Sequence, residues 1–289
     1  MRLRMKLINL EQNTPEWLEF RRRRIGASEW ATILGLNPHK TPLQLWEEKL
    51  GLRELPAYNE RMQEGHRIEP IARQWFNESC DYNFVPKVGV HDIYDWLHAS
   101  FDGIDEDTET VLEIKNVKIE YHELAKQGVV PLLYAPQVQA QMFISGYEDA
   151  YYLSWGHEPA WVHVIFDDEF INEALPKIEE FKRCLDNLVE PELTERDYVD
   201  KSDDVFLTDK VQMYKYYQKM AKEYESKCEI LKEEICSMVN HRNTKGQGFR
   251  VTKYTTQGRV DYSAIPELKD VKLDKYRKPC TTNFRLTLD

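Results

Sequence analysis

The chain has 289 residues, of which 42% are hydrophobic and 31% are charged, as is ordinary for a globular protein. Its apolar runs are far shorter than the ~20 residues that cross a bilayer, and its start lacks the apolar segment of a signal peptide, so we expect a cytoplasmic protein with no membrane partner. Five widely spaced cysteines with no C-x-x-C pair argue for a reduced protein and against a zinc ribbon.

The net charge of −11 is unevenly distributed along the chain. Residues 1–40 and residues 250–289 each carry a net charge of +4, which leaves −19 on residues 41–249. Because a local field is set by charges within about a Debye length, a chain that is acidic in total can still present a positive groove. The net charge therefore does not exclude DNA as a partner.

Capping residues mark the first predicted helices. Thr14 and Thr41 each precede a proline, as N-cap residues often do, and we expect Ser28 to cap a short helix between them. The three helices are predicted to run to about residues 24, 35 and 51. Apolar spacing then predicts a longer helix over about residues 62–76.

The middle of the chain predicts a mixed α/β (α+β) core. We expect strands over about residues 84–90, 98–101, 111–114, 150–155 and 161–166. Helices are expected over about residues 119–126, 136–145 and 168–188. This order favours a mixed central sheet flanked by helices over a doubly wound sheet, and the sequence contains no glycine-rich phosphate loop.

The character of the sequence changes after Pro191, so we predict a core domain over residues 1–190 and a C-terminal extension over residues 191–289. In the extension, apolar residues recur at steps of three and four from Met213 to Met238. This spacing predicts a long amphipathic helix over about residues 207–240, which serves packing or assembly. A β-hairpin is expected in the segment that begins at Gly246.

The segment SFDGIDEDTETVLEIKN (residues 100–116) places charged groups at the end of an apolar run. Side chains alternate along a strand, so Glu113 and Lys115 share one face, and we expect Asp102 at the start of a turn beside them. Two carboxylates, helped by the Ile114 carbonyl, could hold divalent cations while the amine orients a water for phosphodiester cleavage. Taken alone, the pattern fits an exposed hairpin with a solvated Glu/Lys pair equally well.

Further motifs accompany this segment in a fixed order. Glu69 follows Gly65 by four residues on the predicted helix over 62–76, and Gln137 begins an apolar helix. Upstream of these motifs, a tryptophan is followed four residues later by an arginine and then by an Ala-Ser-Glu segment: Trp17, Arg21, Ala27, Ser28 and Glu29. Over about residues 15–185 the sequence resembles the PD-(D/E)xK nuclease superfamily and, within it, the lambda exonuclease and YqaJ-type phage recombinase family.

The resemblance implies a restriction-endonuclease-like core and a catalytic set within it. Asp102, Glu113 and the Ile114 carbonyl would bind Mg²⁺, and Lys115 would act on the attacking water. Glu69 would support a second metal ion, with Mn²⁺ able to replace Mg²⁺. In addition, Gln137 would line the site near the scissile phosphate.

The resemblance also implies how a DNA end is held. Arg21 with Ser28 would bind the 5′-phosphate of the degraded strand, a task suited to a guanidinium fork. Four consecutive arginines point all round a helix, so at most two can face one groove, and Arg24 is the second candidate.

The implied activity is 5′→3′ degradation of one strand of linear duplex DNA, which leaves 3′ tails for a single-strand annealing protein. The resemblance further implies a homo-oligomer, in several relatives a ring around DNA, encoded by a phage or prophage and acting in the bacterial cytoplasm. Two alternatives stay open: an endonuclease with the same core, and a noncatalytic DNA-binding scaffold for recombination.

The sequence departs from the superfamily pattern at two places. The proline that usually precedes the aspartate is Phe101 here. The Q-x-x-x-Y pattern of RecB-type relatives is absent, since Gln141 stands four residues after Gln137. The second departure favours the lambda-like subgroup.

Overall fold

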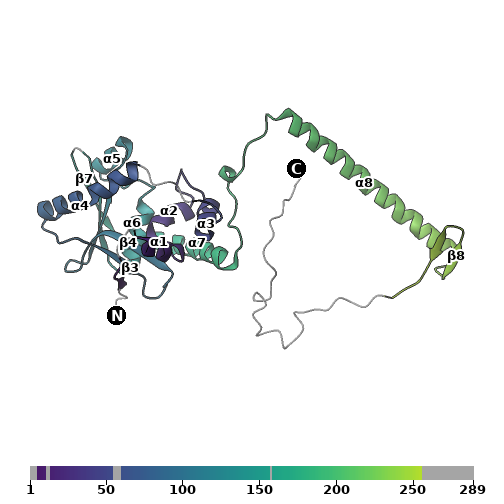
Figure 1. The fold of residues 1–289 in the computed structure, drawn as a ribbon, viewed down its shortest axis with the longest axis horizontal. Coiled ribbons are helices and arrows are strands. Elements are labelled where there is room, and N and C mark those ends of the chain that lie inside the picture. The colour runs from purple at the N-terminus through teal and green to yellow at the C-terminus, as the bar shows by residue number, and fades with distance from the viewer. Residues whose placement is uncertain (1–4, 11–13, 55–59, 157, 256–289) are drawn as a thin grey trace. The chain divides into compact units, whose positions relative to one another are not determined.

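The computed structural model describes residues 5–10, 14–54, 60–156 and 158–255 (Figure 1). It divides the chain into two compact units, Met1–Val199 and Asp200–Asp289. The division falls later than the expected boundary after residue 190, because the short helix η2 (Glu195–Asp197) is tied to the first unit. There Thr41 donates a hydrogen bond to the Asp197 carboxylate at 2.5 Å.

The first unit holds the predicted α/β elements. In chain order they are β1 (Lys6–Ile8), α1 (Pro15–Arg22), β2 (Ile25–Gly26), η1 (Ala27–Glu29), α2 (Trp30–Ile33), α3 (Pro42–Leu50), α4 (Glu60–Cys80), β3 (Val85–Val90), β4 (Leu97–Asp105), β5 (Thr110–Lys115), α5 (Ile119–Lys126), α6 (Ala135–Ser145), β6 (Asp149–Ser154), β7 (Ala160–Ile165), α7 (Asp168–Asn187) and η2.

Within the described residues, the strands of this unit form one mixed sheet of seven strands. The strand order is β1-β3-β4-β5-β6-β7, and β2 pairs with β4 outside that path. The pairs β5–β6 and β2–β4 are parallel, while the other pairs are antiparallel. The predicted mixed central sheet flanked by helices is confirmed.

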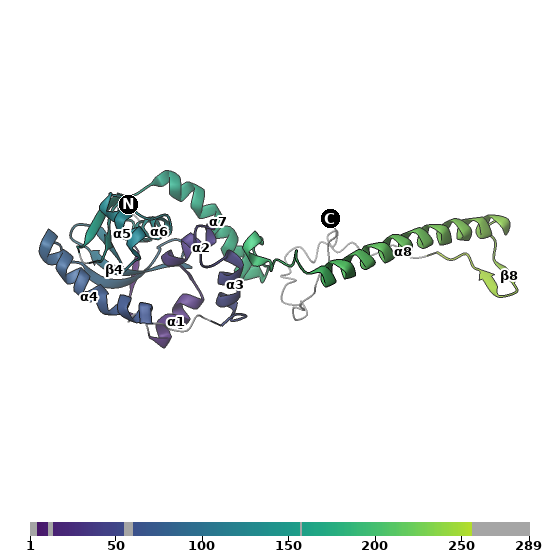
Figure 2. The same ribbon diagram turned by 90° about the horizontal axis from the view of Figure 1, so that it is seen from above.

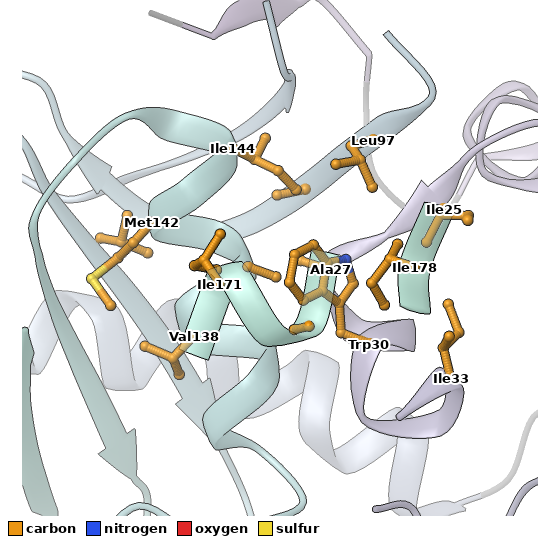
Figure 3. Packing of buried hydrophobic residues seen from close by; sticks show 14 of the residues in the cluster. Ile25, Ala27, Trp30, Ile33, Leu97, Val138, Met142, Ile144, Ile171 and Ile178 are labelled. Atoms are coloured by element: carbon orange, nitrogen blue, oxygen red, sulfur yellow. The ribbon is translucent and has the colours of Figure 1, made fainter. Parts of the chain in front are cut away.

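Helices cover both faces of the sheet (Figures 1 and 2). Because neighbouring strand residues point to opposite faces, Leu112 packs in the cluster under α4, whereas Val111 belongs to the larger cluster under α2, α6 and α7. In the larger cluster, Trp30 lies among Ile171 and Ile178 (Figure 3). The cavity described below lies beside this core.

Threonine capping is confirmed at two helices. The Thr14 hydroxyl accepts from the Trp17 N–H at 3.2 Å, and Thr41 forms a capping box with Gln44. Ser28, by contrast, does not cap a helix over 28–35, which the structure divides into η1 and α2. Glu29 instead accepts from the Gly26 N–H at 2.8 Å, and this leaves the Ser28 hydroxyl for the cavity.

The expected turn at Asp102 is wrong, because Asp102 and Gly103 lie inside β4. Gly103 pairs with Leu112, and a Cβ at Gly103 would lie 2.8 Å from the Phe84 Cβ. The glycine is therefore required by close packing across the sheet. The chain turns later, where Glu109 adopts a positive φ of 51°.

The second unit contains α8 (Val205–Met238) and a hairpin of β8 (Thr244–Gly246) and β9 (Phe249–Val251). The long helix is confirmed. A hairpin is present over residues 244–251, whereas it was expected over residues 246–262. The part of the predicted hairpin segment beyond residue 255 lies outside the described residues. A search of the described helices found none with the length and apolar character required to cross a membrane.

Candidate functional site

A cavity of about 150 Å³ lies where α1, η1, α4, β4, β5 and α6 meet. It collects side chains that are far apart in the sequence. Seven of the predicted site residues line it: Arg21, Ser28, Glu69, Asp102, Glu113, Lys115 and Gln137. The structure therefore unites the two predicted groups, the carboxylate–lysine set and the arginine–serine pair, in one cavity.

Adjacent strands hold the two central carboxylates. Asp102 on β4 accepts a hydrogen bond from the Ile114 N–H at 2.8 Å, which ties it to β5. Glu113 is only 1% exposed and forms an ion pair with Lys115 on the same strand face. Because β4 and β5 are hydrogen-bonded neighbours, backbone pairing brings the two residues that carry these groups close together.

Two glutamines of α6 orient Glu113. Gln137 Nε2 donates to one oxygen of the Glu113 carboxylate and Gln141 Nε2 donates to the other, both at 2.6 Å. The two glutamines are four residues apart, so they lie on one face of the helix. A carboxylate held at both oxygens has little freedom to rotate.

The carboxylates of the cavity destabilise one another's charged forms. Burial, followed by the charge of Glu113, raises the pKa of Asp102 well above its usual range. Burial also raises the pKa of Glu69, although the charges of His66 and Lys115 oppose the shift. Three carboxylates close to one amine form a site that an added cation would stabilise.

Lys115 is the amine of this cluster. Burial alone would lower its pKa, but the charges of Glu113 and Asp102 outweigh burial, and the pKa of Lys115 is raised above its ordinary value. The ammonium also lies 5.6 Å from the centre of the Tyr134 ring. Lys115 is therefore protonated at neutral pH, and it can donate hydrogen bonds and offset negative charge.

The donor set fits a hard divalent cation. In the described part of the chain, no three His, Cys, Asp or Glu side chains group together as a complete metal site. Asp102 and Glu113 nevertheless present carboxylate oxygens from adjacent strands, with the Ile114 main chain between them. Mg²⁺ is commonly held by one or two carboxylates together with waters and substrate phosphates, so these residues suit it.

The part of the cavity wall that α1 and η1 form is basic and aromatic. Arg21 Nη2 donates to Ser28 Oγ at 3.2 Å, and its guanidinium lies 4.5 Å from the centre of the Trp17 ring. Trp17 Nε1 in turn donates to Ser100 Oγ at 2.9 Å. A guanidinium and two hydroxyls thus stand together where an anion could bind.

Lys49 of α3 holds the end of α1 and the start of η1 in place. Its ammonium lies 2.7 Å from Glu29 and donates to the carbonyls of Arg21 at 3.0 Å and Arg24 at 2.5 Å. Burial lowers the pKa of Lys49, while the Glu29 carboxylate opposes that shift. The contacts join the end of α1 to η1 and so set the position of Arg21.

Arg24 is the one predicted side chain that the structure does not bring to the cavity. It donates to the Asp95 carbonyl at 3.1 Å, and its guanidinium lies 4.3 Å from the centre of the Phe20 ring. The reason is geometric, since α1 ends at Arg22 and Arg24 follows in the turn before β2.

Every residue that lines the cavity falls between positions 16 and 148. The model of the YqaJ-like viral recombinase domain family matches those same residues, 16–148. Residues 16–148 are thus similar to that family's domain and are called the YqaJ-like domain below. The YqaJ-like domain therefore contains the complete cavity, whereas α7 and the second unit lie outside the match.

Known proteins resemble the chain over somewhat more than half of its length. The uncharacterized protein YqaJ of Bacillus subtilis (strain 168) is 30% identical over 173 residues, which are 57% of this chain and 54% of YqaJ. The chain thus spans about half the length of this curated relative.

Solved structures show the same fold. The alkaline exonuclease LHK-Exo of Laribacter hongkongensis superposes with a TM-score of 0.53 at 24% identity, over 60% of this chain and 93% of that one. The structure of LHK-Exo in complex with dAMP gives a TM-score of 0.52 at the same identity and coverage. At this level of identity the likeness concerns the architecture.

The YqaJ-like domain also places residues at the cavity that sequence reasoning missed. His98 and Ser100 precede Asp102 at steps of two on β4, so strand alternation could have found them. His66, for which the sequence analysis proposed no role, lines the cavity one helical turn before Glu69. Gln141 follows Gln137 by one helical turn. In the sequence it was notable only because it stands where the Q-x-x-x-Y pattern would have a tyrosine.

Proposed function

We propose that the YqaJ-like domain is a Mg²⁺-dependent 5′→3′ exonuclease that degrades one strand of linear duplex DNA. One observation carries the proposal: the cavity joins a carboxylate–lysine set to an arginine–serine pair. The first set suits hydrolysis of a phosphodiester, and the second suits a terminal phosphate. The fold shared with LHK-Exo, an alkaline exonuclease with a dAMP complex, is consistent with this assignment.

The residues of the cavity would have different roles in phosphodiester hydrolysis. Asp102 and Glu113, with the Ile114 carbonyl, would hold Mg²⁺, which supplies Lewis-acid polarisation of a phosphoryl oxygen. Lys115 donates a hydrogen bond to the attacking water and offsets the negative charge that grows on the phosphoryl group.

The remaining cavity residues position the substrate. Gln137 holds the Glu113 carboxylate in one orientation, and Glu69 adds negative charge for a second ion. Arg21 and Ser28 bind the 5′-phosphate. This contact positions the strand so that its terminal nucleotide is the one removed.

The first experiment compares Lys115→Ala with Lys118→Ala, a matched change at an exposed lysine three residues away. On 5′-phosphorylated linear duplex with Mg²⁺, we expect Lys115→Ala to lower the cleavage rate by about 100-fold or more. Binding of the DNA end and the activity of Lys118→Ala should be preserved. Unchanged digestion by Lys115→Ala would refute the assignment.

The second experiment tests the phosphate pair with Arg21→Ala against Arg23→Ala, whose side chain is 75% exposed and pairs with Glu19. Wild type and Arg23→Ala should prefer 5′-phosphate ends over 5′-hydroxyl ends, and Arg21→Ala should lose that preference. Equal rates of the wild type on both ends would remove this role from Arg21.

An endonuclease of the same superfamily is the competing activity. A covalently closed circular duplex separates the two, because an exonuclease leaves it intact. Labels at each end of a linear duplex report the polarity. Degradation of the circle, or release of the 3′ label first, would contradict the proposal.

We further propose that the 3′ tails are passed to a single-strand annealing protein in the bacterial cytoplasm, and that the enzyme works as a homo-oligomer. A ring that encloses the DNA would stay on it between cleavage steps, so such an assembly would make degradation processive. Sedimentation of the full chain with and without duplex DNA measures the assembly, and a monomer on DNA would exclude it.

A further inference from the structure

Helix α8 carries an apolar stripe that the described part of the chain leaves exposed. None of its residues is buried, and Phe206, Tyr224 and Met238 are 74%, 58% and 83% exposed. The members of the stripe, called the α8 stripe below, are Phe206, Met213, Tyr217, Met220, Tyr224, Cys228, Leu231, Ile235 and Met238. At about 100° of rotation per residue, these positions fall within an arc of about 80°.

Such a stripe is characteristic of a helix that packs against another helix. It continues over nearly all of α8, which at 1.5 Å per residue is about 50 Å long. A solvated helix would have polar residues on every face, whereas this one has apolar side chains throughout that arc except at Lys210. Outside the arc charged residues predominate, although Leu207, Tyr216 and Ile230 are exposed there as well. A second helix of the same length would cover the whole stripe.

The charges of α8 are divided between its two halves. Residues 205–222 contain four lysines and one aspartate, a net charge of +3. Residues 223–238 contain five glutamates and two lysines, a net charge of −3. Two such helices side by side repel each other when parallel and attract each other when antiparallel, because only the antiparallel arrangement brings unlike halves together.

We propose that α8 pairs in antiparallel orientation with α8 of a second copy of this chain. Six of the nine members of the α8 stripe pair with one another about position 222, so most of the stripe can face itself after reversal. Phe206 then lies opposite Met238, Met213 opposite Leu231, and Met220 opposite Tyr224. The pairing rests on α8 alone and does not depend on the nuclease assignment.

The first test measures pairing in the full chain by light scattering and sedimentation at several protein concentrations. Tyr224→Glu puts a charge into the α8 stripe, while Ser226→Glu puts the same charge on the opposite side of the helix. We expect Tyr224→Glu to raise the dissociation constant at least tenfold and Ser226→Glu to leave it near that of the wild type. A monomeric wild type, or equal effects of the two variants, would overturn the proposal.

The second test determines orientation by disulfide cross-linking. In a full-length background with Cys228→Ser, Cys236→Ser and Cys280→Ser, one chain carries Met213→Cys and another carries Leu231→Cys. In an antiparallel pair, residue 213 faces residue 231, so we expect cross-linked dimers only when the two chains are mixed and oxidised. Each chain alone should stay uncross-linked.

The outcomes of the second test are distinct. Cross-linking of the mixture alone supports the antiparallel pair. Self-cross-linking of either single chain means that identical positions meet, as in a parallel pair, and overturns the proposal. Absence of cross-links in all three samples overturns it as well. Nuclease assays on the same variants keep the two proposals separate, since loss of pairing with retained cleavage leaves the catalytic assignment intact.

Discussion

The two units of the molecule use apolar residues in opposite ways. In Met1–Val199, large side chains such as Trp30 and Phe76 are fully buried on the two faces of the sheet. In Asp200–Asp289, α8 has a regular apolar stripe and no buried residue among those described. Apolar periodicity thus predicts a helix in both units. Periodicity does not indicate whether the surface that packs against the apolar face belongs to the same chain or to another.

Ionisable groups show the same contrast. In the first unit, burial and neighbouring charges shift the pKa values of Lys49, His98 and Asp102. In α8, Lys227 and Lys232 form ion pairs with glutamates one turn away, and the side chains of these pairs are 49–73% exposed. The same type of substitution is therefore expected to have a large effect in the first unit and a small one in α8.

The largest difference is expected for Glu113→Gln against Glu229→Gln. The first change keeps the shape of a side chain that is 1% exposed, but it removes a carboxylate of the proposed metal site. We expect cleavage of linear duplex to fall by about 100-fold or more, and Mg²⁺ affinity measured by calorimetry to fall with it. Glu229, on the exposed surface of α8, should tolerate the change with full activity.

The next difference is in stability, for Phe76→Ala against Phe206→Ala. Phe76 is 0% exposed, and its removal should lower the free energy of unfolding of the first unit by about 3–5 kcal/mol. Phe206 is 74% exposed and should change it by less than about 0.5 kcal/mol. All seven tryptophans lie between positions 17 and 161, so tryptophan fluorescence during urea unfolding reports this unit alone. Equal losses would contradict the division into units.

A third pair is Lys49→Met against Lys232→Met. Lys49 is buried against Glu29 and two carbonyls, and its loss leaves the largely buried Glu29 carboxylate with only the more distant Arg21, at 3.9 Å, as an ion-pair partner. We expect a loss of about 3 kcal/mol in the free energy of unfolding, together with a weaker preference for 5′-phosphate ends, because Arg21 is no longer fixed. Lys232→Met should have no measurable effect on either quantity.

The smallest effect concerns pH, with His98→Gln against His241→Asn. Burial, and then the charges of Arg21, Lys49 and Arg24, hold the pKa of His98 well below its usual value. The imidazole is thus neutral in the folded state but takes up a proton in the unfolded state below about pH 6.5. Since the unfolded state then binds more protons, stability falls as pH falls, with a slope of up to ~1.4 kcal/mol per pH unit.

Urea unfolding at pH 7.5, 6.5 and 5.5 measures that slope. His98→Gln should flatten it, because the amide has no proton to gain, while the exposed His241→Asn should leave it as in the wild type. The slope is the decisive quantity, since His98→Gln also changes the packing beside Gly26 at every pH. Identical slopes in all three proteins would show that His98 does not titrate differently on folding.

Local signals in the sequence were sufficient for much of the fold. Thr14 and Thr41 cap helices as expected, since a cap depends only on a hydroxyl and the three residues that follow it. Alternation along β5 correctly put Glu113 and Lys115 on one face. Asp102 was misplaced in a turn, because glycine after aspartate is a turn signal, whereas here the packing of Phe84 and Leu112 requires the glycine.

The sequence by itself determined the elements, the spacing of the motif residues and the amphipathic character of α8, because each follows from contacts between residues a few positions apart. Only the tertiary structure decided which of them meet. Arg21 reaches the cavity while Arg24 turns away, and His98 lines a site in which no local pattern had predicted it. The reason is that strand pairing and helix packing fix distances between segments many residues apart, and no local pattern encodes those distances.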